Sequence, residues 1–212
     1  MRCSRRLLLL TIGLIVSAPA FAQGQTFAIA GFTVGARISP EELEPFACSP
    51  SRWTGAEREC RKTKEAKQVS AATSLFLDKQ DKLQFLSQKF DNIPLTEKSA
   101  EEVIAAHSKR FNVEPRRVVK QVGADKVMIA AWGDVELKEI DIQPRLATIQ
   151  GRQGDELLLI DLINDIDKSA LEVLPIYQIE KGKGAIWTFY IRPGAPGWAI
   201  ARIISPGEGA RR

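Results

Sequence analysis

The apolar run Leu7–Val16 is the feature that most limits what this chain can fold into. It follows a short basic start and closes at Ala20-Phe21-Ala22, a small-x-small pattern typical of a cleavage site. The run is too short to stay in a bilayer as a spanning helix. We therefore predict that residues 1–22 are a signal peptide, and that the fold is built from the remaining 190 residues (212 − 22 = 190) in an oxidising compartment.

The compartment expected from this signal is the periplasm or the extracellular space. Cys3 precedes the apolar run, so no cysteine is placed to accept a lipid at the new N-terminus, and a non-lipidated protein is expected. Ser4–Leu8 partly resembles a twin-arginine export signal, and the choice between that route and the general secretory route stays open. No transmembrane segment is expected after cleavage.

The signal peptide also carries most of the excess positive charge. The whole chain has 30 Lys and Arg against 26 Asp and Glu, and Arg2, Arg5 and Arg6 leave with the signal. The mature chain then holds 27 basic residues (30 − 3 = 27) against 26 acidic ones. Because so balanced a chain has no excess charge to attract phosphates, no nucleic-acid partner is predicted.

Two cysteines remain in the mature chain, Cys48 and Cys60. In an oxidising compartment a lone pair is most simply a disulfide, which would stabilise the fold by roughly 2–3 kcal/mol through restriction of the unfolded chain. Their spacing is not that of a redox Cys-x-x-Cys motif. Neither cysteine has a neighbouring Cys or His to complete a zinc site, so no metal is predicted there.

The first part of the mature chain, residues 23–92, predicts an αββ unit that contains the disulfide. Thr26–Gly35 alternates in polarity and indicates a strand. Ser39 opens a capping box with proline at the first helical position, so we expect a short helix to about Ala47. A charged stretch then leads into a hairpin, and the stretch, first strand, turn and second strand are Glu57–Gln68, Val69–Leu77, Asp78–Asp81 and Lys82–Phe90.

The second part, residues 93–212, predicts two further helices with antiparallel strands. Ser99 begins a capping box, and an apolar stripe follows at helical spacing to Phe111. Asp155–Ala170 has a similar stripe, although residues 157–163 fit either a helix or a buried strand. The expected strands form a hairpin and a closing three-stranded meander: Val127–Trp132 with Val135–Ile142, then Val173–Ile179, Ala185–Ile191 and Trp198–Ile204.

This alternation of helices with hairpins predicts an α+β fold. Helices would pack on one face of an antiparallel sheet or sheets, in two or three αββ-like units.

The chain offers little that indicates catalysis. His107, the sole histidine, lies on the apolar stripe of its predicted helix, which favours a packing role over a catalytic one. No nucleophile, phosphate-loop or zinc-protease motif accompanies it. The acidic group Asp161–Asp167 fails the calcium-loop pattern, because Ala170 stands where a glycine is required and Ile176 where a glutamate is required. We predict no catalytic residue, no metal and no cofactor.

Two features could instead bind a partner. Tyr190 and Trp198 flank a Pro/Gly-rich turn and are the candidates for an exposed aromatic patch. Two basic clusters could meet an anionic surface, although interleaved acidic residues favour solvated faces. The clusters are Arg58, Arg61, Lys62, Lys64 and Lys67, and Lys109, Arg110, Arg116, Arg117 and Lys120.

Several segments look familiar. Met128–Leu137, Leu174–Ile179 and Gly184–Trp187 resemble segments of uncharacterised exported proteins of soil and plant-associated alphaproteobacteria, a resemblance that implies no activity. Gly31–Glu44 with the hairpin after it is similar in outline to outer-membrane assembly lipoproteins of the BamE type, whose fold is shared by β-lactamase-inhibitor proteins. This second resemblance covers residues 31–90 and lacks the family's lipid-accepting cysteine.

The leading hypothesis from the sequence is a non-enzymatic periplasmic binding or adaptor protein that contacts another envelope protein through exposed sheet edges and loop aromatics. One alternative is a hydrolase with a dispersed active site around His107. Another is a module that binds anionic lipid or lipopolysaccharide through the basic clusters. The sequence leaves the partner, the biological process and the oligomeric state undetermined.

Overall fold

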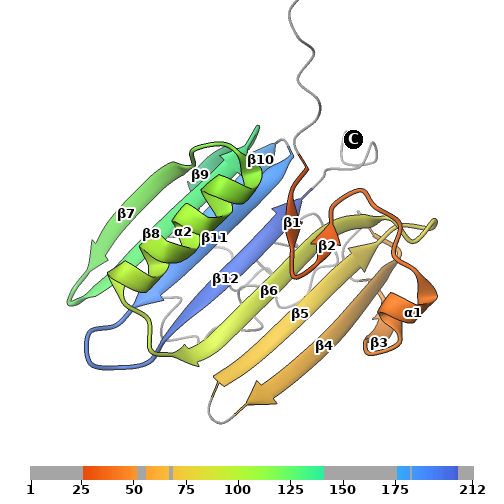
Figure 1. The fold of residues 1–212 in the computed structure, drawn as a ribbon, viewed down its shortest axis with the longest axis horizontal. Helices are drawn as coiled ribbons and strands as arrows, with labels where there is room; N and C mark the ends of the chain where they lie inside the picture. The colour runs from red at the N-terminus through yellow and green to blue at the C-terminus, as the bar shows by residue number, and fades with distance from the viewer. Residues whose placement is uncertain (1–25, 52–55, 67–68, 141–175, 182, 205–212) are drawn as a thin grey trace, which may run out of the picture.

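Eight antiparallel strands form one continuous sheet in this computed structural model, which describes residues 26–51, 56–66, 69–140, 176–181 and 183–204 (Figure 1). The spatial order is β3-β4-β5-β6-β12-β11-β8-β7, so β3 and β7 are the two edges. The eight strands are β3 (Ala47–Pro50), β4 (Arg58–Ala66), β5 (Val69–Leu77), β6 (Leu83–Ile93), β7 (Arg116–Val122), β8 (Asp125–Gly133), β11 (Gly184–Ile191) and β12 (Gly197–Ile204).

Three of these strands follow one another directly as the meander β4-β5-β6. The predicted strand Val69–Leu77 is confirmed with the same bounds. The predicted turn is also confirmed, and Asp78 holds it, since its Oδ1 accepts hydrogen bonds from the backbone N–H groups of Gln80 and Lys82 at 2.8 and 2.9 Å. The charged stretch before it is itself strand β4, which pairs with β5 along its whole length. Cys60 is fully buried on one face of β4, and Lys62 and Lys64 on the same face are exposed.

The main helix, α2 (Glu97–Phe111), lies across one face of the sheet. Its apolar stripe is confirmed, with Ala100, Ile104 and Phe111 buried. The predicted start is wrong by one turn: Thr96 is the N-cap, and Ser99 is the third helical residue that completes the capping box. The Ser99 hydroxyl accepts the hydrogen bond from the N-cap backbone N–H that a glutamate side chain usually accepts. The prediction therefore took the third helical residue for the N-cap.

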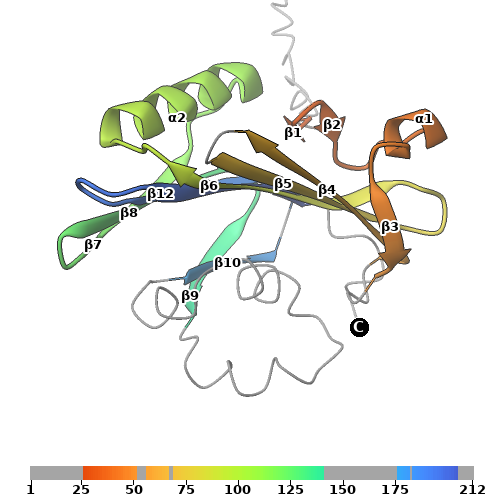
Figure 2. The same cartoon turned by 90° about the horizontal axis from the view of Figure 1, so that it is seen from below.

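The N-terminal residues cover the rest of the same face (Figure 2). Thr26–Gly35 is two short paired strands rather than the single predicted strand, β1 (Ala28–Ile29) and β2 (Phe32–Thr33), because Ala30 and Gly31 both have positive φ and reverse the chain. The capping box at Ser39 is confirmed and begins the one-turn helix α1 (Pro40–Leu43).

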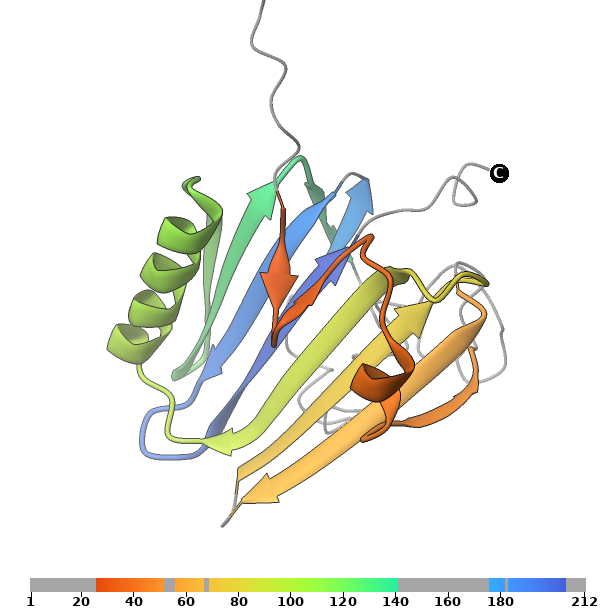
Figure 3. The same ribbon diagram turned by 45° about the vertical axis from the view of Figure 1, so that its right-hand side comes forward.

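The two faces of the sheet carry separate apolar clusters. The face under α2 and β1-β2 holds a larger cluster that includes Trp132, Trp187 and Phe189, and Figure 3 shows these elements in front of that face. The opposite face holds a smaller cluster that includes Phe85, Ile129 and Tyr190. Polar side chains are buried on that second face as well: Ser74, Ser87, Lys89 and Arg202.

Two predicted strand pairings are wrong. β8 does not form a hairpin with the following strand β9 (Glu136–Ile140); it lies between β7 and β11 in the large sheet. β9 instead pairs with β10 (Ile176–Lys181) in a separate two-stranded sheet, so β10 is not part of the closing meander. The chain leaves the large sheet at Gly133, whose φ of +93° favours glycine, and Figure 2 shows β9 and β10 on the side away from α2.

The predicted fold class is thus confirmed only broadly. An antiparallel sheet with its helices on one face is present, and the hairpin of Ala185–Ile191 with Trp198–Ile204 is confirmed as β11-β12. The molecule is mostly β with one substantial helix among the described residues, not a set of αββ units, because hairpins from both parts of the chain join in one sheet at the β6-β12 pair. The predicted helix Asp155–Ala170, including residues 157–163, lies outside the described residues.

Candidate functional site

The outermost strand β7 is the longer of the two edge strands of the large sheet. It pairs along all seven of its residues with β8 and, among the described residues, with no other strand. Its outer side therefore presents backbone N–H and C=O groups that can accept a further strand. Figure 1 shows β7 at the left-hand limit of the sheet, beyond α2.

Local sequence explains why an extended strand follows the helix here. Asn112 ends α2 in the left-handed conformation, with φ +53°. Pro115 then prevents a return to helix, and three valines favour the extended conformation of β7. Gly123, with φ +62°, turns the chain back into β8. From the sequence, Arg116, Arg117 and Lys120 were predicted only as part of a basic cluster, and the strand β7 was not predicted.

The side chains of β7 alternate between the two faces. On the α2 side, Arg117 Nη1 donates to Glu101 Oε2 at 2.8 Å, which links the edge to the helix. Its neighbour on that face, Val119, is 56% exposed and is the one large exposed apolar residue in the described part of the chain. On the other face, Val118 and Val122 pack against the smaller apolar cluster, while Arg116 and Lys120 reach the surface.

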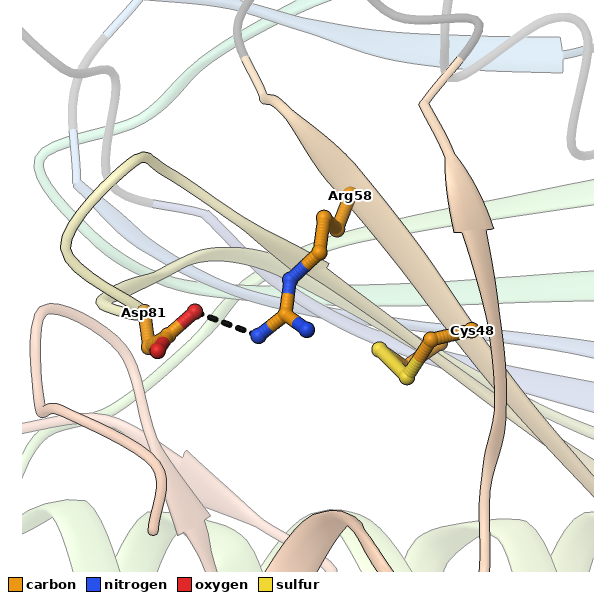
Figure 4. The surroundings of a disulfide bond; sticks show 4 residues. Cys48, Arg58 and Asp81 are labelled. Atoms are coloured by element: carbon orange, nitrogen blue, oxygen red, sulfur yellow. Dashed lines mark hydrogen bonds and ion pairs between the residues drawn. A yellow bond between two sulfur atoms is a disulfide. The ribbon is translucent and has the colours of Figure 1, made fainter. Parts of the chain in front are cut away.

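The opposite edge, β3, is far less open to pairing. It has four residues and ends in Pro50, which has no backbone N–H. The predicted disulfide Cys48–Cys60 is confirmed and joins β3 to β4 at directly opposite residues. Arg58, on the same face of β4, donates to Asp81 in the β5-β6 turn, as Figure 4 shows beside the disulfide. A covalent link and an ion pair therefore hold this edge in place.

The predicted aromatic pair lies on β11 and β12, in the same half of the sheet as β7. Tyr190 and Trp198 are directly opposite on β11 and β12, with ring centroids 5.4 Å apart. The register continues from Tyr190 to Val127 on β8 and to Lys120 on β7, so this row runs along one face to the open edge. Tyr190 is only 7% exposed, so a partner would meet Trp198 and the adjacent turn more than the tyrosine.

Tyr190 is held in place by polar contacts. Its hydroxyl donates to Asp125 Oδ2, and Arg192 lies over its ring, with the guanidinium carbon 5.9 Å from the centroid. Burial, followed by the contact with Asp125, raises the pKa of Tyr190 to about 12. The phenol is therefore protonated at neutral pH, and its role here is to donate a hydrogen bond to Asp125, not to act as a base.

His107 lies among aromatic rings under α2. Its ring centroid is 5.3 Å from those of Phe111 and Trp187 and 6.0 Å from that of Trp132. Burial, with a smaller contribution from Arg110, lowers its pKa below the ordinary value. Its buried Nδ1 has no hydrogen-bond partner among the described residues. These surroundings are those of a packed imidazole, and its burial favours the neutral form.

The two basic clusters are not single cationic surfaces. In the first, Arg58, Lys62 and Lys64 lie on the α2 side of β4, where Arg58 is paired with Asp81, and Arg61 lies on the other side, while Lys67 is outside the described residues. In the second, Arg117 is paired with Glu101. Among residues the structure describes, no group of three or more His, Cys, Asp or Glu could hold a metal ion. The acidic group Asp161–Asp167 is outside that part of the chain.

Comparisons with known proteins add nothing to the description of this site. Neither protein-family models, nor curated proteins, nor solved structures give a match. The resemblances given above therefore stay predictions. Within the described ranges, no helix combines the length and apolar content required to cross a bilayer.

Proposed function

We propose that this is a non-enzymatic periplasmic binding or adaptor protein that contacts envelope proteins by strand pairing along β7. The observation that carries the proposal is the seven-residue edge strand, whose outer main chain is open in the described part of the sheet. Sheet edges are usually shortened, covered or interrupted, because an open one invites another strand. The edge at β3 is short and ends in proline, whereas β7 is seven residues long, contains no proline and carries the cations Arg116, Arg117 and Lys120 instead.

The side chains around β7 support a protein partner. Val119 places an exposed apolar group at the middle of the strand, where an added strand would cover it. The row through Tyr190 and Trp198 extends the contact on the opposite face. Strand addition draws its affinity from main-chain hydrogen bonds and its specificity from such flanking side chains.

The compartment and the absence of catalysis are part of the proposal. The disulfide Cys48–Cys60 supports an oxidising compartment, as the predicted signal peptide does. The aromatic surroundings of His107 favour a structural role for the one histidine in the chain over a hydrolytic one.

In-cell photo-crosslinking tests the proposal. A photoreactive residue at Gln121, exposed on β7, should capture a specific envelope protein, whereas the same residue at Gln80, exposed in the β5-β6 turn, should not. Val119→Lys in the Gln121 background should abolish the adduct, because a lysine on an edge opposes strand pairing. Equal capture from both positions, or none from Gln121, would contradict the proposal.

A further inference from the structure

The β7 edge carries a self-complementary pattern. We propose that the strand that occupies it is β7 of a second copy of this chain, antiparallel and centred on Val119. Two eight-stranded sheets would then join into one continuous sheet across a two-fold axis. This inference rests on the proposed function, because it names the occupant of the same edge.

Symmetry restricts how two copies of β7 can pair. Directly opposite residues in a sheet point to the same face, and a two-fold axis perpendicular to the sheet keeps each face on its own side. A symmetric antiparallel pairing must therefore be centred on one residue that lies opposite its own copy. Only a centre at Val119, the middle residue of β7, pairs all seven residues.

Charge selects the same register. Centred on Val119, the pairing places Arg116 opposite Val122, Arg117 opposite Gln121, Val118 opposite Lys120 and Val119 opposite itself. A centre on Val118 would place Arg116 opposite Lys120. A centre on Arg117 or Lys120 would place that cation opposite itself. Like charges directly opposite are destabilising, and the full-length register has no such pair. A centre on Gln121 also has none but would pair only Lys120–Val122 of the strand.

Burial and the position of the helix agree with this register. Val119, 56% exposed in a single copy, would contact its symmetry mate at the axis. Arg117 is already drawn toward the helix by Glu101. The helix α2 packs on β8 and β11 and reaches β7 through the Arg117–Glu101 ion pair, so the two β7 strands would separate the helices of the two copies (Figure 1).

The remaining repulsion predicts how salt acts. In this register Lys120 lies diagonally across from both Arg116 and Lys120 of the second copy, at roughly 7–8 Å. Both side chains are exposed, so added salt screens them over a Debye length of about 10 Å at 0.1 M. The dimer should therefore tighten as salt rises from low concentration. An acidic partner on the same cations would instead bind more weakly as salt rises.

Charge reversal at the axis tests the inference. By sedimentation velocity, the exported protein should be a dimer, and Val119→Lys and Val119→Asp should each be monomeric, because residue 119 always meets its own charge. A 1:1 mixture of these two variants should form a heterodimer. Val119→Thr, which keeps the shape and adds no charge, should remain dimeric. Circular dichroism of each variant should match the wild type, since residue 119 is exposed.

Other outcomes would overturn the inference. They are a monomeric wild-type protein at all concentrations, dimers that survive both charge variants, or a Lys/Asp mixture that stays monomeric. A monomeric protein whose Gln121 crosslinker still captures a different protein would refute the second copy and leave the proposed function intact. A monomeric protein with no adduct at Gln121 would refute both.

Discussion

The two ends of the large sheet are held by different interactions. At one end, β3 is short, ends in Pro50 and is tied to β4 by the Cys48–Cys60 disulfide. At the other end, β7 is longer and its outer main chain is open, and packing beneath α2 stabilises the strands beside it. A covalent link closes one edge, whereas the other is left free to pair. The proposed binding edge therefore lies beside the packed strands and at the far end of the sheet from the disulfide.

The largest loss of stability should come from a substitution in the larger apolar cluster, on the strands beside β7. Trp132 on β8 is fully buried, packs against Phe111 at 5.6 Å between centroids, and donates from Nε1 to Ser108 Oγ at 3.1 Å. Trp132→Ala should lower the free energy of unfolding by about 3–5 kcal/mol in urea titrations. Val119→Ala on the open edge should change it by less than about 0.5 kcal/mol. Similar losses for both variants would remove the distinction between the packed strands and the edge.

Removing the disulfide should affect the opposite end most. A double Cys48→Ala, Cys60→Ala variant should lose roughly 2–3 kcal/mol of stability, the contribution expected for a loop of this length. Hydrogen exchange measured by mass spectrometry should rise most in β3 and β4, and in β7 and β8 only as far as the lower global stability requires. An increase at β7 as large as that at β3 would show that the two ends are not held independently.

Acid should lower the free energy of unfolding through His107, which packs against Trp187 on the sheet. Its folded pKa lies below the ordinary value of 6.5, so the unfolded chain binds more protons as pH falls through that value. The stability associated with the neutral imidazole is present above about pH 6.5 and is lost as pH falls below it. Urea midpoints between pH 7.5 and 5 should therefore decline, and His107→Phe should reduce the slope. A variant with an unchanged slope would exclude His107 as the cause.

The smallest effect concerns the aromatic row that leads to the open edge. Tyr190→Phe removes the hydrogen bond to Asp125 and should lower stability by about 1 kcal/mol, because Asp125 can regain water. Trp198→Ala, with the fold retained by circular dichroism, should weaken capture by the Gln121 crosslinker. Full capture by the Trp198 variant would remove the aromatic row from the binding surface.

Local patterns predicted the elements better than their pairing. The capping box at Ser39, the strand Val69–Leu77 and the stripe on α2 depend on neighbours within a few residues, and the structure confirms them. The predicted pairing of Cys48 with Cys60 is also confirmed, because these are the two cysteines that follow residue 22. Pairing depends on distant strands, so β9 and β10 were assigned to the wrong partners.

The open edge was not predicted because its sequence is ambiguous. β7 has cations at three of its seven positions, and this density concealed the valines that face the smaller apolar cluster. The burial of Lys89 shows the same difficulty, since its ion pair with Asp91, at 2.9 Å, depends on the folded strand. Exposed edges were expected only in general terms, and nothing local distinguished β7 from other basic segments.

The most direct test of the open edge is disulfide formation from single cysteines on β7. In the oxidised protein, Val119→Cys should form an intermolecular disulfide rapidly, because residue 119 lies opposite its own copy at the proposed axis. Gln121→Cys, also exposed but opposite Arg117 of the second copy, should crosslink far more slowly. A covalent dimer is expected from the first variant and almost none from the second. Equal yields from both, or a covalent dimer from neither, would contradict the proposed pairing.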